Sequence, residues 1–178
     1  MRVLIDANVL FPTVLREIVL GLAGAGGFEP LWSARILEEW RRAAARVGDA
    51  AVAEYEIAAV RAAFPDAEVT VVSETEAGLT LPDANDTHVL AAAVDGHADE
   101  LLTLNTRDFP SNALAAVGVI RRHPDEFLLE AWHGDPDRMN LIVSGVLARA
   151  GAHGIDVSSP RAVLKRARLP RLGKAMFA

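Results

Sequence analysis

The chain of 178 residues contains no cysteine. This absence excludes disulfides, cysteine-bound zinc, iron–sulfur clusters and thiol nucleophiles, so any metal must be held by oxygen or imidazole ligands. The sequence also lacks any stretch of about 20 apolar residues, and the apolar N-terminal run ends at Asp6, so neither a membrane span nor a signal peptide is predicted. From these absences we expect a soluble, cytoplasmic protein.

Lysine is almost absent as well, since Lys165 and Lys174 are the only ones and both lie near the C-terminus. The glycine-rich segment 24–27 follows a predicted helix and lacks the Gly-Lys-Ser/Thr ending of a phosphate-binding loop. A receiver-type phosphoacceptor domain would need a lysine after a late core strand, and none is present there. Both of these functions are therefore excluded.

Charge is distributed unevenly along the chain. Residues 1–120 contain 8 basic and 18 acidic residues, whereas residues 121–178 contain 10 basic and 6 acidic ones. An acidic first part is unsuited to coating nucleic acid passively, but it suits protein partners or carboxylates that bind cations. The basic tail keeps polyanions possible as ligands.

Strands and helices are predicted to alternate over the first two thirds of the chain. Apolar patterning predicts strands at 3–5, 69–72, 101–104 and 119–120, and helices at 8–22, 34–47, 49–64, 82–96 and 111–117. This alternation is typical of βαβ units, so we predict an α/β fold, a doubly wound parallel sheet with helices on both faces. After residue 124 only helices are predicted, at 125–132, 137–150 and 160–168.

Acidic and polar residues cluster where the predicted strands end. Asp6 follows the first strand, and Asn105 and Asp108 follow a later one. Ligands of open parallel sheets bind beyond the carboxyl ends of the strands, so these side chains are expected to converge. The alanine-rich helix runs in the opposite direction, which would bring Asp83 and Asp86 in its first turn to the same edge.

Helical phase selects among the remaining candidates. Asp86 falls on the apolar stripe of its helix, where a carboxylate needs a compensating partner. On the helix at 34–47, Glu39 lies at the edge of the apolar stripe, while Glu38 points toward water. His88 falls off the stripe of its helix and is expected at the rim or on the surface.

Several carboxylates brought together would repel one another and take up protons unless a divalent cation neutralised them. Oxygen ligands without cysteine favour Mg²⁺ or Mn²⁺, which keep several waters and bind phosphate oxygens. The expected chemistry is metal-assisted hydrolysis of a phosphodiester.

Each acidic residue also has a purely structural explanation. Asp6 and Asp83 could cap the helices that follow them, and Asp108 could cap a short turn. Asp86 could interact with the helix dipole, and Glu39 could form a surface ion pair with the arginine four residues before it.

Four ordered motifs carry a family resemblance. They read LIDANVL at residues 4–10, WSARILEE at 32–39, LPDANDTHVLAAA at 81–93 and LTLNTRDFP at 102–110. With these motifs the chain resembles PIN-domain ribonucleases, especially the VapC-type toxins of bacterial toxin–antitoxin modules. The resemblance divides the chain into a PIN-like nuclease domain, residues 1–128, and a helical C-terminal extension, residues 129–178.

The resemblance implies cleavage of RNA that depends on Mg²⁺ or Mn²⁺, a homodimer, and inhibition by a cognate antitoxin protein. It implies three acidic metal ligands that are also the catalytic residues, and further supporting residues around them. The ligands are Asp6, Glu39 and Asp86, and the supporting residues are Asp83, Thr103, Asn105 and Asp108. The family often has an aspartate where this chain has Asn105, so a second ion is expected to bind more weakly.

Two hypotheses follow from these residues. The first is a metal-dependent endoribonuclease toxin, and the alternative is a catalytically silent PIN-like binding protein that acts through a protein partner. The basic tail adds a possible RNA contact through Arg161, Lys165, Arg166 and Arg168, although a solvated helix face or an oligomer contact would explain the same charges.

Overall fold

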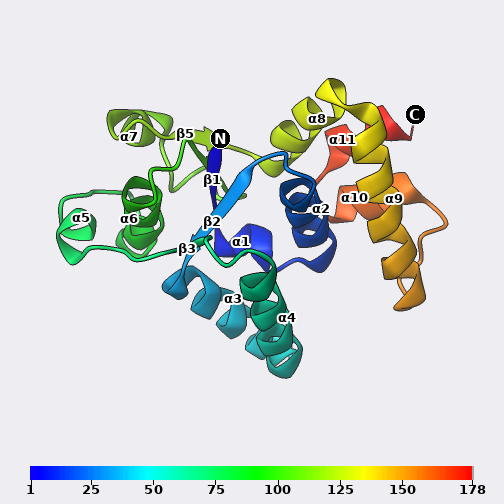
Figure 1. Cartoon of the computed structure of the whole chain (residues 1–178), viewed down its shortest axis with the longest axis horizontal. Helices are drawn as coiled ribbons and strands as arrows, with labels where there is room; N and C mark the ends of the chain where they lie inside the picture. The colour runs from blue at the N-terminus through cyan, green and yellow to red at the C-terminus, as the bar shows by residue number, and fades with distance from the viewer. Residues whose placement is uncertain (178) are drawn as a thin grey trace. The chain divides into compact units, whose positions relative to one another are not determined.

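The structure, a computed structural model, describes residues 1–177 and divides into two compact units (Figure 1). The first unit contains Met1–Phe11 and Phe28–Arg122, and the second contains Pro12–Gly27 and the chain from His123 onward. Each unit is therefore built from two separate stretches of sequence. Among the described residues, no helix is long and apolar enough to cross a membrane.

Five parallel strands form the sheet of the first unit. They are β1 (Arg2–Ile5), β2 (Glu29–Ser33), β3 (Glu68–Val69), β4 (Glu100–Leu102) and β5 (Ile120–Arg122), in the order β3-β2-β1-β4-β5. Leu4 of β1 pairs with Leu31 on one side and with Leu101 on the other. The chain thus winds outward from β1 in one direction and then in the other, which makes the sheet doubly wound. Its strand order reverses between β1 and β4, which is where sheets of this kind bind ligands.

Helices surround this sheet in the first unit. They are α1 (Ala7–Leu10), α3 (Ala34–Arg46), α4 (Ala50–Ala63), α5 (Ser73–Ala77), the 3₁₀ helix η1 (Ala84–Asp86), α6 (Thr87–Asp95) and α7 (Ser111–Ala116). Ser33 caps α3 by accepting a hydrogen bond from the backbone N–H of Ile36, and Ile36 and Trp40 are buried beneath the helix. α6 packs against β2, β1 and β4, and five consecutive residues from Val89 to Ala93 are all buried.

As far as residue 177, the second unit contains helices and no strands. It consists of α2 (Thr13–Gly24), α8 (Pro124–Gly134), α9 (Pro136–Ala152), α10 (Pro160–Arg166) and α11 (Pro170–Met176). α2 packs against α9, and α8 packs against both α9 and α11. The predicted fold class, a doubly wound parallel α/β sheet with a helical C-terminal region, is confirmed. The domain division at residue 128 stays a prediction, and the compact units follow other bounds because α2 joins the C-terminal helices.

Three predicted elements differ from the observed ones, and three observed elements were not predicted. The single helix expected at 8–22 is two helices, because Pro12 has no N–H to continue the helical hydrogen bonds. The strand expected at 69–72 pairs with β2 only over Glu68–Val69 and is not buried, because it lies at the sheet edge. The helix expected from 82 begins as η1, and β2, α5 and α11 were not predicted at all.

Asp125 of α8 anchors α11 within the second unit. Its carboxylate is 3% exposed and accepts hydrogen bonds from the backbone N–H groups of Arg171 (2.9 Å) and Leu172 (3.0 Å). These N–H groups lie in the first turn of α11 and have no partner within their own helix. The carboxylate of Asp125 therefore caps α11 from a neighbouring helix. Leu169, the residue before α11, makes no cap hydrogen bond with its side chain.

Asp125→Ala is expected to lower the free energy of unfolding by about 2 kcal/mol, because a buried and a partly buried N–H group lose their acceptor. For a chain of this size that corresponds to a fall of roughly 4–8 °C in the melting temperature, measured by thermal denaturation. Asp137→Ala is the matched control, since Asp137 lies exposed in the first turn of α9. Equal melting temperatures for the two variants would contradict this role of Asp125.

Candidate active site

Asp6 and Thr103 join the ends of the two central strands. Asp6 follows β1 and is 6% exposed, and its backbone N–H donates to the carbonyl of Leu102 in β4. The Thr103 hydroxyl donates to Oδ2 of Asp6 at 2.7 Å, and the Nδ2 of Asn8 donates to the same oxygen at 2.6 Å. The Asp6 side chain makes no cap hydrogen bond of good geometry to α1, and its carboxylate is held mainly by Thr103 and Asn8.

Two asparagines extend this network. Asn8 accepts a hydrogen bond from the backbone N–H of Leu104 (3.0 Å), which ties α1 to the segment after β4. Asn105 donates through Nδ2 to Asp86 (3.1 Å) and accepts at Oδ1 from the backbone N–H of Asp108 (3.3 Å). Asn105 therefore directs an amide donor, not its carbonyl oxygen, toward the neighbouring carboxylate. Sequence reasoning missed Asn8, although its position two residues after Asp6 at a strand end was a usable signal.

Asp83 and Asp86 come to the site from η1. Asp83 is exposed and accepts hydrogen bonds from the backbone and side-chain N–H groups of Asn85 (2.9 and 3.0 Å), so it has the capping role considered from sequence. Asp86 is half-buried and makes no cap hydrogen bond with its side chain. Asp86 is thus the member of this pair whose carboxylate has no local structural role.

The two adjacent glutamates of α3 have different environments. Glu38 is held by Arg41 and Arg42, and hydrogen bonds from these arginines lower its pKa to about 2. Glu39 instead lies 2.8 Å from Nε2 of His88, measured to its Oε1. It does not pair with Arg35, because Arg35 binds Glu76 at 3.1 Å. The surface ion pair considered for Glu39 is therefore not formed.

His88 is buried, and its predicted place at the rim or surface is wrong. It is 1% exposed, because α6 is covered on nearly all sides and not along one stripe. Its Nε2 is close to Glu39, yet neither ring nitrogen forms a hydrogen bond of good geometry. The 2.8 Å approach of Nε2 to Oε1 is therefore a polar contact between Glu39 and α6, not a hydrogen bond.

A groove of about 830 Å³ collects the predicted ligands. It is lined by five acidic and three basic side chains, namely Asp6, Glu38, Glu39, Asp83 and Asp86, and Arg35, Arg42 and Arg46. The groove is not lined by Thr103, Asn105 or Asp108. Thr103 donates a hydrogen bond to Asp6, Asn105 donates to Asp86, and the backbone N–H of Asp108 donates to Asn105. The structure thus brings Asp6, Glu39 and Asp86 to one groove from three different elements.

The carboxylates of the groove act on one another. Burial, and then repulsion from Glu39, raises the pKa of Asp6 above its ordinary value, although the Thr103 hydrogen bond opposes the shift. Burial raises the pKa of Asp86 to about 6, with added repulsion from Asp6, Asp83, Asp108 and Glu39. This mutual repulsion is the property that a bound dication would relieve.

The donor set suits a hard divalent ion that keeps part of its water shell. Within residues 1–177, no three acidic or histidine side chains are grouped tightly enough to enclose an ion by themselves. Mg²⁺ is usually held by one or two carboxylates together with several waters, so a complete protein cage is not needed. The residues that would hold such an ion are Asp6, Glu39 and Asp86.

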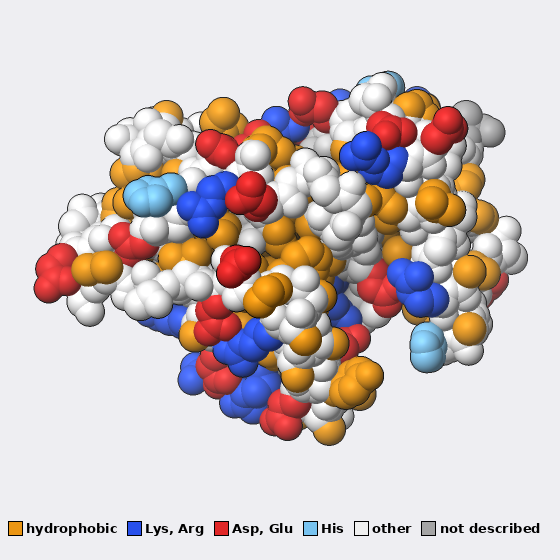
Figure 2. Space-filling view, in the orientation of Figure 1, with side chains coloured by type: hydrophobic (Ala, Val, Ile, Leu, Met, Phe, Trp, Pro, Cys, Tyr) orange, Lys and Arg blue, Asp and Glu red, His pale blue; other side chains and the backbone are white. Residues whose placement is uncertain are grey.

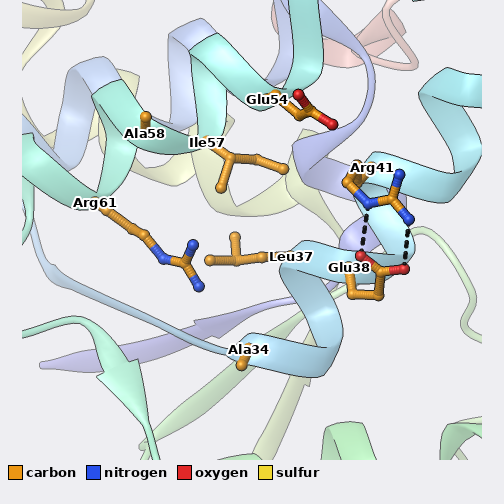
Figure 3. A pocket seen from close by; sticks show the side chains of 8 residues that line it. All are labelled: Ala34, Leu37, Glu38, Arg41, Glu54, Ile57, Ala58 and Arg61. Carbon is orange, nitrogen blue, oxygen red and sulfur yellow. Dashed lines mark hydrogen bonds and ion pairs between the residues drawn. The ribbon is translucent and has the colours of Figure 1, made fainter. Parts of the chain in front are cut away.

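A second pocket, of about 440 Å³, lies between α3 and α4 (Figure 3). Leu37 and Ile57 give it an apolar lining, and Figure 3 shows Arg41 bound to Glu38 beside it. Glu38 and Arg41 are paired with each other here, and no cluster of carboxylates is present. We therefore assign the chemistry to the larger, acidic groove.

The basic residues of the C-terminal tail are all exposed. Arg161, Lys165 and Arg166 lie on α10, and Arg168 follows it. Val163 and Leu164 of the same helix are buried, so α10 is a folded amphipathic helix within the second unit.

Comparisons with known proteins agree with the motifs of the sequence. The family model described as the PIN domain matches residues 2–107. A Mycobacterium tuberculosis protein named "Putative ribonuclease VapC50" is 47% identical over 62 residues, which are 35% of this chain and 37% of that protein. The chain thus spans little more than a third of the relative that it matches. No solved structure matches the chain significantly.

Proposed function

Since the chain belongs to the PIN domain family, we propose that it is an endoribonuclease that uses carboxylate-bound Mg²⁺ or Mn²⁺ to hydrolyse RNA phosphodiester bonds. The observation that carries this proposal is the convergence of Asp6, Glu39 and Asp86 on one groove at the reversal point of the sheet. The similarity to a protein named as a ribonuclease supports the choice of RNA as substrate.

Each residue of the site has a distinct task in this proposal. Asp6, Glu39 and Asp86 would hold the ion, and the chemistry that the ion supplies is activation of the attacking water and neutralisation of charge at the scissile phosphate. Thr103 and Asn8 fix the orientation of Asp6 by donating to its Oδ2. Asn105 fixes Asp86 in the same way, and Asp83 and Asp108 add negative charge that favours a cation.

Cleavage of a labelled RNA by the full chain tests the proposal. We expect internal cleavage in Mg²⁺ or Mn²⁺ and none after chelation with EDTA. Cleavage that persists unchanged in EDTA would contradict the metal dependence, and intact RNA under all conditions would contradict the nuclease function.

A catalytically silent binding protein is the second candidate, and the contact between Asn105 and Asp86 favours it. The neutral amide of Asn105 already donates a hydrogen bond to the Asp86 carboxylate. This hydrogen bond would replace part of the stabilisation that an ion would give to the carboxylate. The two functions are separated by calorimetric titration with Mn²⁺, because a silent binder would take up no ion at the carboxylates.

The biological setting is part of the same proposal. We propose that the protein is the cytoplasmic toxin of a toxin–antitoxin module, that it forms a homodimer, and that a cognate antitoxin inhibits it. The motif resemblance to VapC-type toxins supports this setting. We also propose that Arg161, Lys165, Arg166 and Arg168 add a second contact to the RNA phosphates, because all four are exposed.

His88→Ala is expected to weaken Mn²⁺ binding about tenfold, because Glu39 loses the side chain against which it rests. His88→Gln should restore part of the affinity by offering another polar group to the glutamate. Val89→Ala is the control, since Val89 is a buried neighbour on the same helix. It should cost stability but leave Mn²⁺ affinity unchanged in calorimetry. Equal Mn²⁺ affinities for His88→Ala and Val89→Ala would contradict a positioning role.

A further inference from the structure

α3 places a row of arginines along the groove. Arg35, Arg42 and Arg46 line it together with Glu39, and the spacings of four, seven and eleven residues from Arg35 put all four on one face of the helix. At a rise of 1.5 Å per residue, the row from Arg35 to Arg46 is about 16 Å long. One proposed metal ligand thus stands between cationic side chains on the same helix. We call Arg35, Arg42 and Arg46 the arginine row.

The arginine row is available to a ligand. Arg35 pairs with Glu76 at 3.1 Å and Arg42 pairs with Glu38 at 2.7 Å, and both arginine side chains are at least half exposed. Exposed ion pairs of this kind contribute little stability, so a phosphate can replace them at small cost. Arg46 lies exposed in the last turn of α3 and forms no ion pair that the described structure records.

The acidic part of the groove makes such a row necessary for a polyanionic substrate. Five carboxylates line the groove, and they would repel the phosphates of a nucleic acid strand. A single ion at the carboxylates would compensate only near the scissile phosphate. Guanidinium groups bind phosphates through paired hydrogen bonds, so the arginine row can offset the repulsion along the rest of the strand.

Resting on the proposed ribonuclease function, we infer that the arginine row binds the backbone phosphates of a single RNA strand and so positions the scissile bond at the carboxylates. The row reads no bases, because phosphate contacts carry no sequence information directly. Of the three arginines, Arg46 is expected to contribute most to RNA affinity, because no ion pair of its own is broken when RNA binds.

The other side of α3 supplies a matched control. Figure 2 shows basic and acidic side chains interleaved over the region of α3 and α4 on the viewed face. Arg41 belongs to the same helix, but it lines the pocket between α3 and α4 and is bound to Glu38 through two hydrogen bonds (Figure 3). Arg41→Gln therefore removes the same charge from the same helix at a position that does not itself line the groove, while Arg42 still binds Glu38.

The test measures the affinity of the full chain for a fluorescent single-stranded RNA in EDTA at several salt concentrations. For Arg46→Gln we expect a severalfold weaker affinity, and a logarithmic salt dependence that is shallower by about 0.7, the value for one lost phosphate contact on a single strand. Arg35→Gln combined with Arg46→Gln should lower the slope by about 1.4. Arg41→Gln should leave the slope unchanged. Equal slopes for wild type, Arg46→Gln and Arg41→Gln would overturn the inference.

Cleavage assays in Mg²⁺ separate this inference from the proposed function. Arg46→Gln should raise KM and leave kcat nearly unchanged, because it acts on binding and not at the reacting atoms. If the wild type cleaves RNA but Arg46→Gln changes neither the slope nor KM, the inference is wrong and the ribonuclease function stands. If RNA binds with an affinity that depends on Arg46 but is never cleaved, the phosphate contact stands and the ribonuclease function is wrong.

Discussion

Asp86→Asn is expected to lower RNA cleavage by about 100-fold or more and, at the same time, to raise the melting temperature of the metal-free protein. The activity falls because one proposed metal ligand loses its charge, while the side-chain volume is kept. The stability rises because Asp86 is partly buried and repelled by Asp6, Asp83, Asp108 and Glu39, which together raise its pKa to about 6. A neutral amide removes that repulsion and can still accept the hydrogen bond from Asn105.

The expected gain in stability is modest. Because Asp86 is only partly buried, solvent screening reduces the repulsion, and we expect about 1 kcal/mol, or roughly 2–4 °C in the melting temperature. Asp66→Asn is the control, since Asp66 is exposed and does not line the groove. It should change neither cleavage nor stability. An Asp86→Asn protein that cleaves RNA at the wild-type rate would remove Asp86 from the catalytic site.

Divalent metal is expected to raise the melting temperature by roughly 5–11 °C when present at 100 times its dissociation constant, since such binding contributes about 2.7 kcal/mol. The effect should be largest above about pH 6, where Asp86 is ionised and its repulsion is strongest. Repulsion among the carboxylates destabilises the folded protein. A bound ion neutralises them and so restores that stability.

The pH dependence of the metal-free protein has a definite sign. In the folded chain Asp86 keeps its proton until about pH 6, whereas in the unfolded chain it loses it near the model-peptide pKa of 3.8. Between these values the folded state binds more protons than the unfolded state, so stability contributed by this group falls as pH rises. Asp6 has the same direction of shift and adds to the trend.

Thermal denaturation between pH 4 and pH 7, with Mn²⁺ and with EDTA, measures both effects. Asp86→Asn is the matched control, because it should show a flatter pH profile in EDTA and a smaller gain from Mn²⁺. A wild-type protein whose melting temperature in EDTA rises steadily over this range, with no gain from Mn²⁺ at pH 7, would contradict the account of the groove.

The site was more predictable from the sequence than the packing around it. Asp6, Asn105 and Asp108 follow strands of a parallel sheet, and the topology of such sheets brings strand ends together whatever the details of the helices. Helical phase separated Glu39 from Glu38, but the expectation that Glu38 points toward water is wrong. Both glutamates line the groove with nearly equal side-chain exposure, 37% and 35%, because Arg41 and Arg42 hold Glu38. Glu39 differs in its contact with His88. The roles of these residues in catalysis stay predictions.

The errors arose where tertiary packing overrides local pattern. β2 was missed because Pro30 lies within it and proline is uncommon in interior strands. His88 was misplaced because a helix buried on nearly all sides has no single apolar stripe. Asn8 was passed over because an asparagine near a helix start has a simple local explanation, and its contacts with Thr103 and Leu104 are about 95 residues away in sequence.

The division of each compact unit between two stretches of sequence affects how the chain assembles as it is synthesised. α2 leaves the ribosome early, but its partner α9 is translated much later, and the ion pair between Glu17 and Arg149 joins positions 132 residues apart. The apolar side of α2 must therefore stay uncovered while the whole sheet is being made. Closure of the second unit is a late event in biogenesis, and a nascent chain that stalls after β5 would present this helix to chaperones.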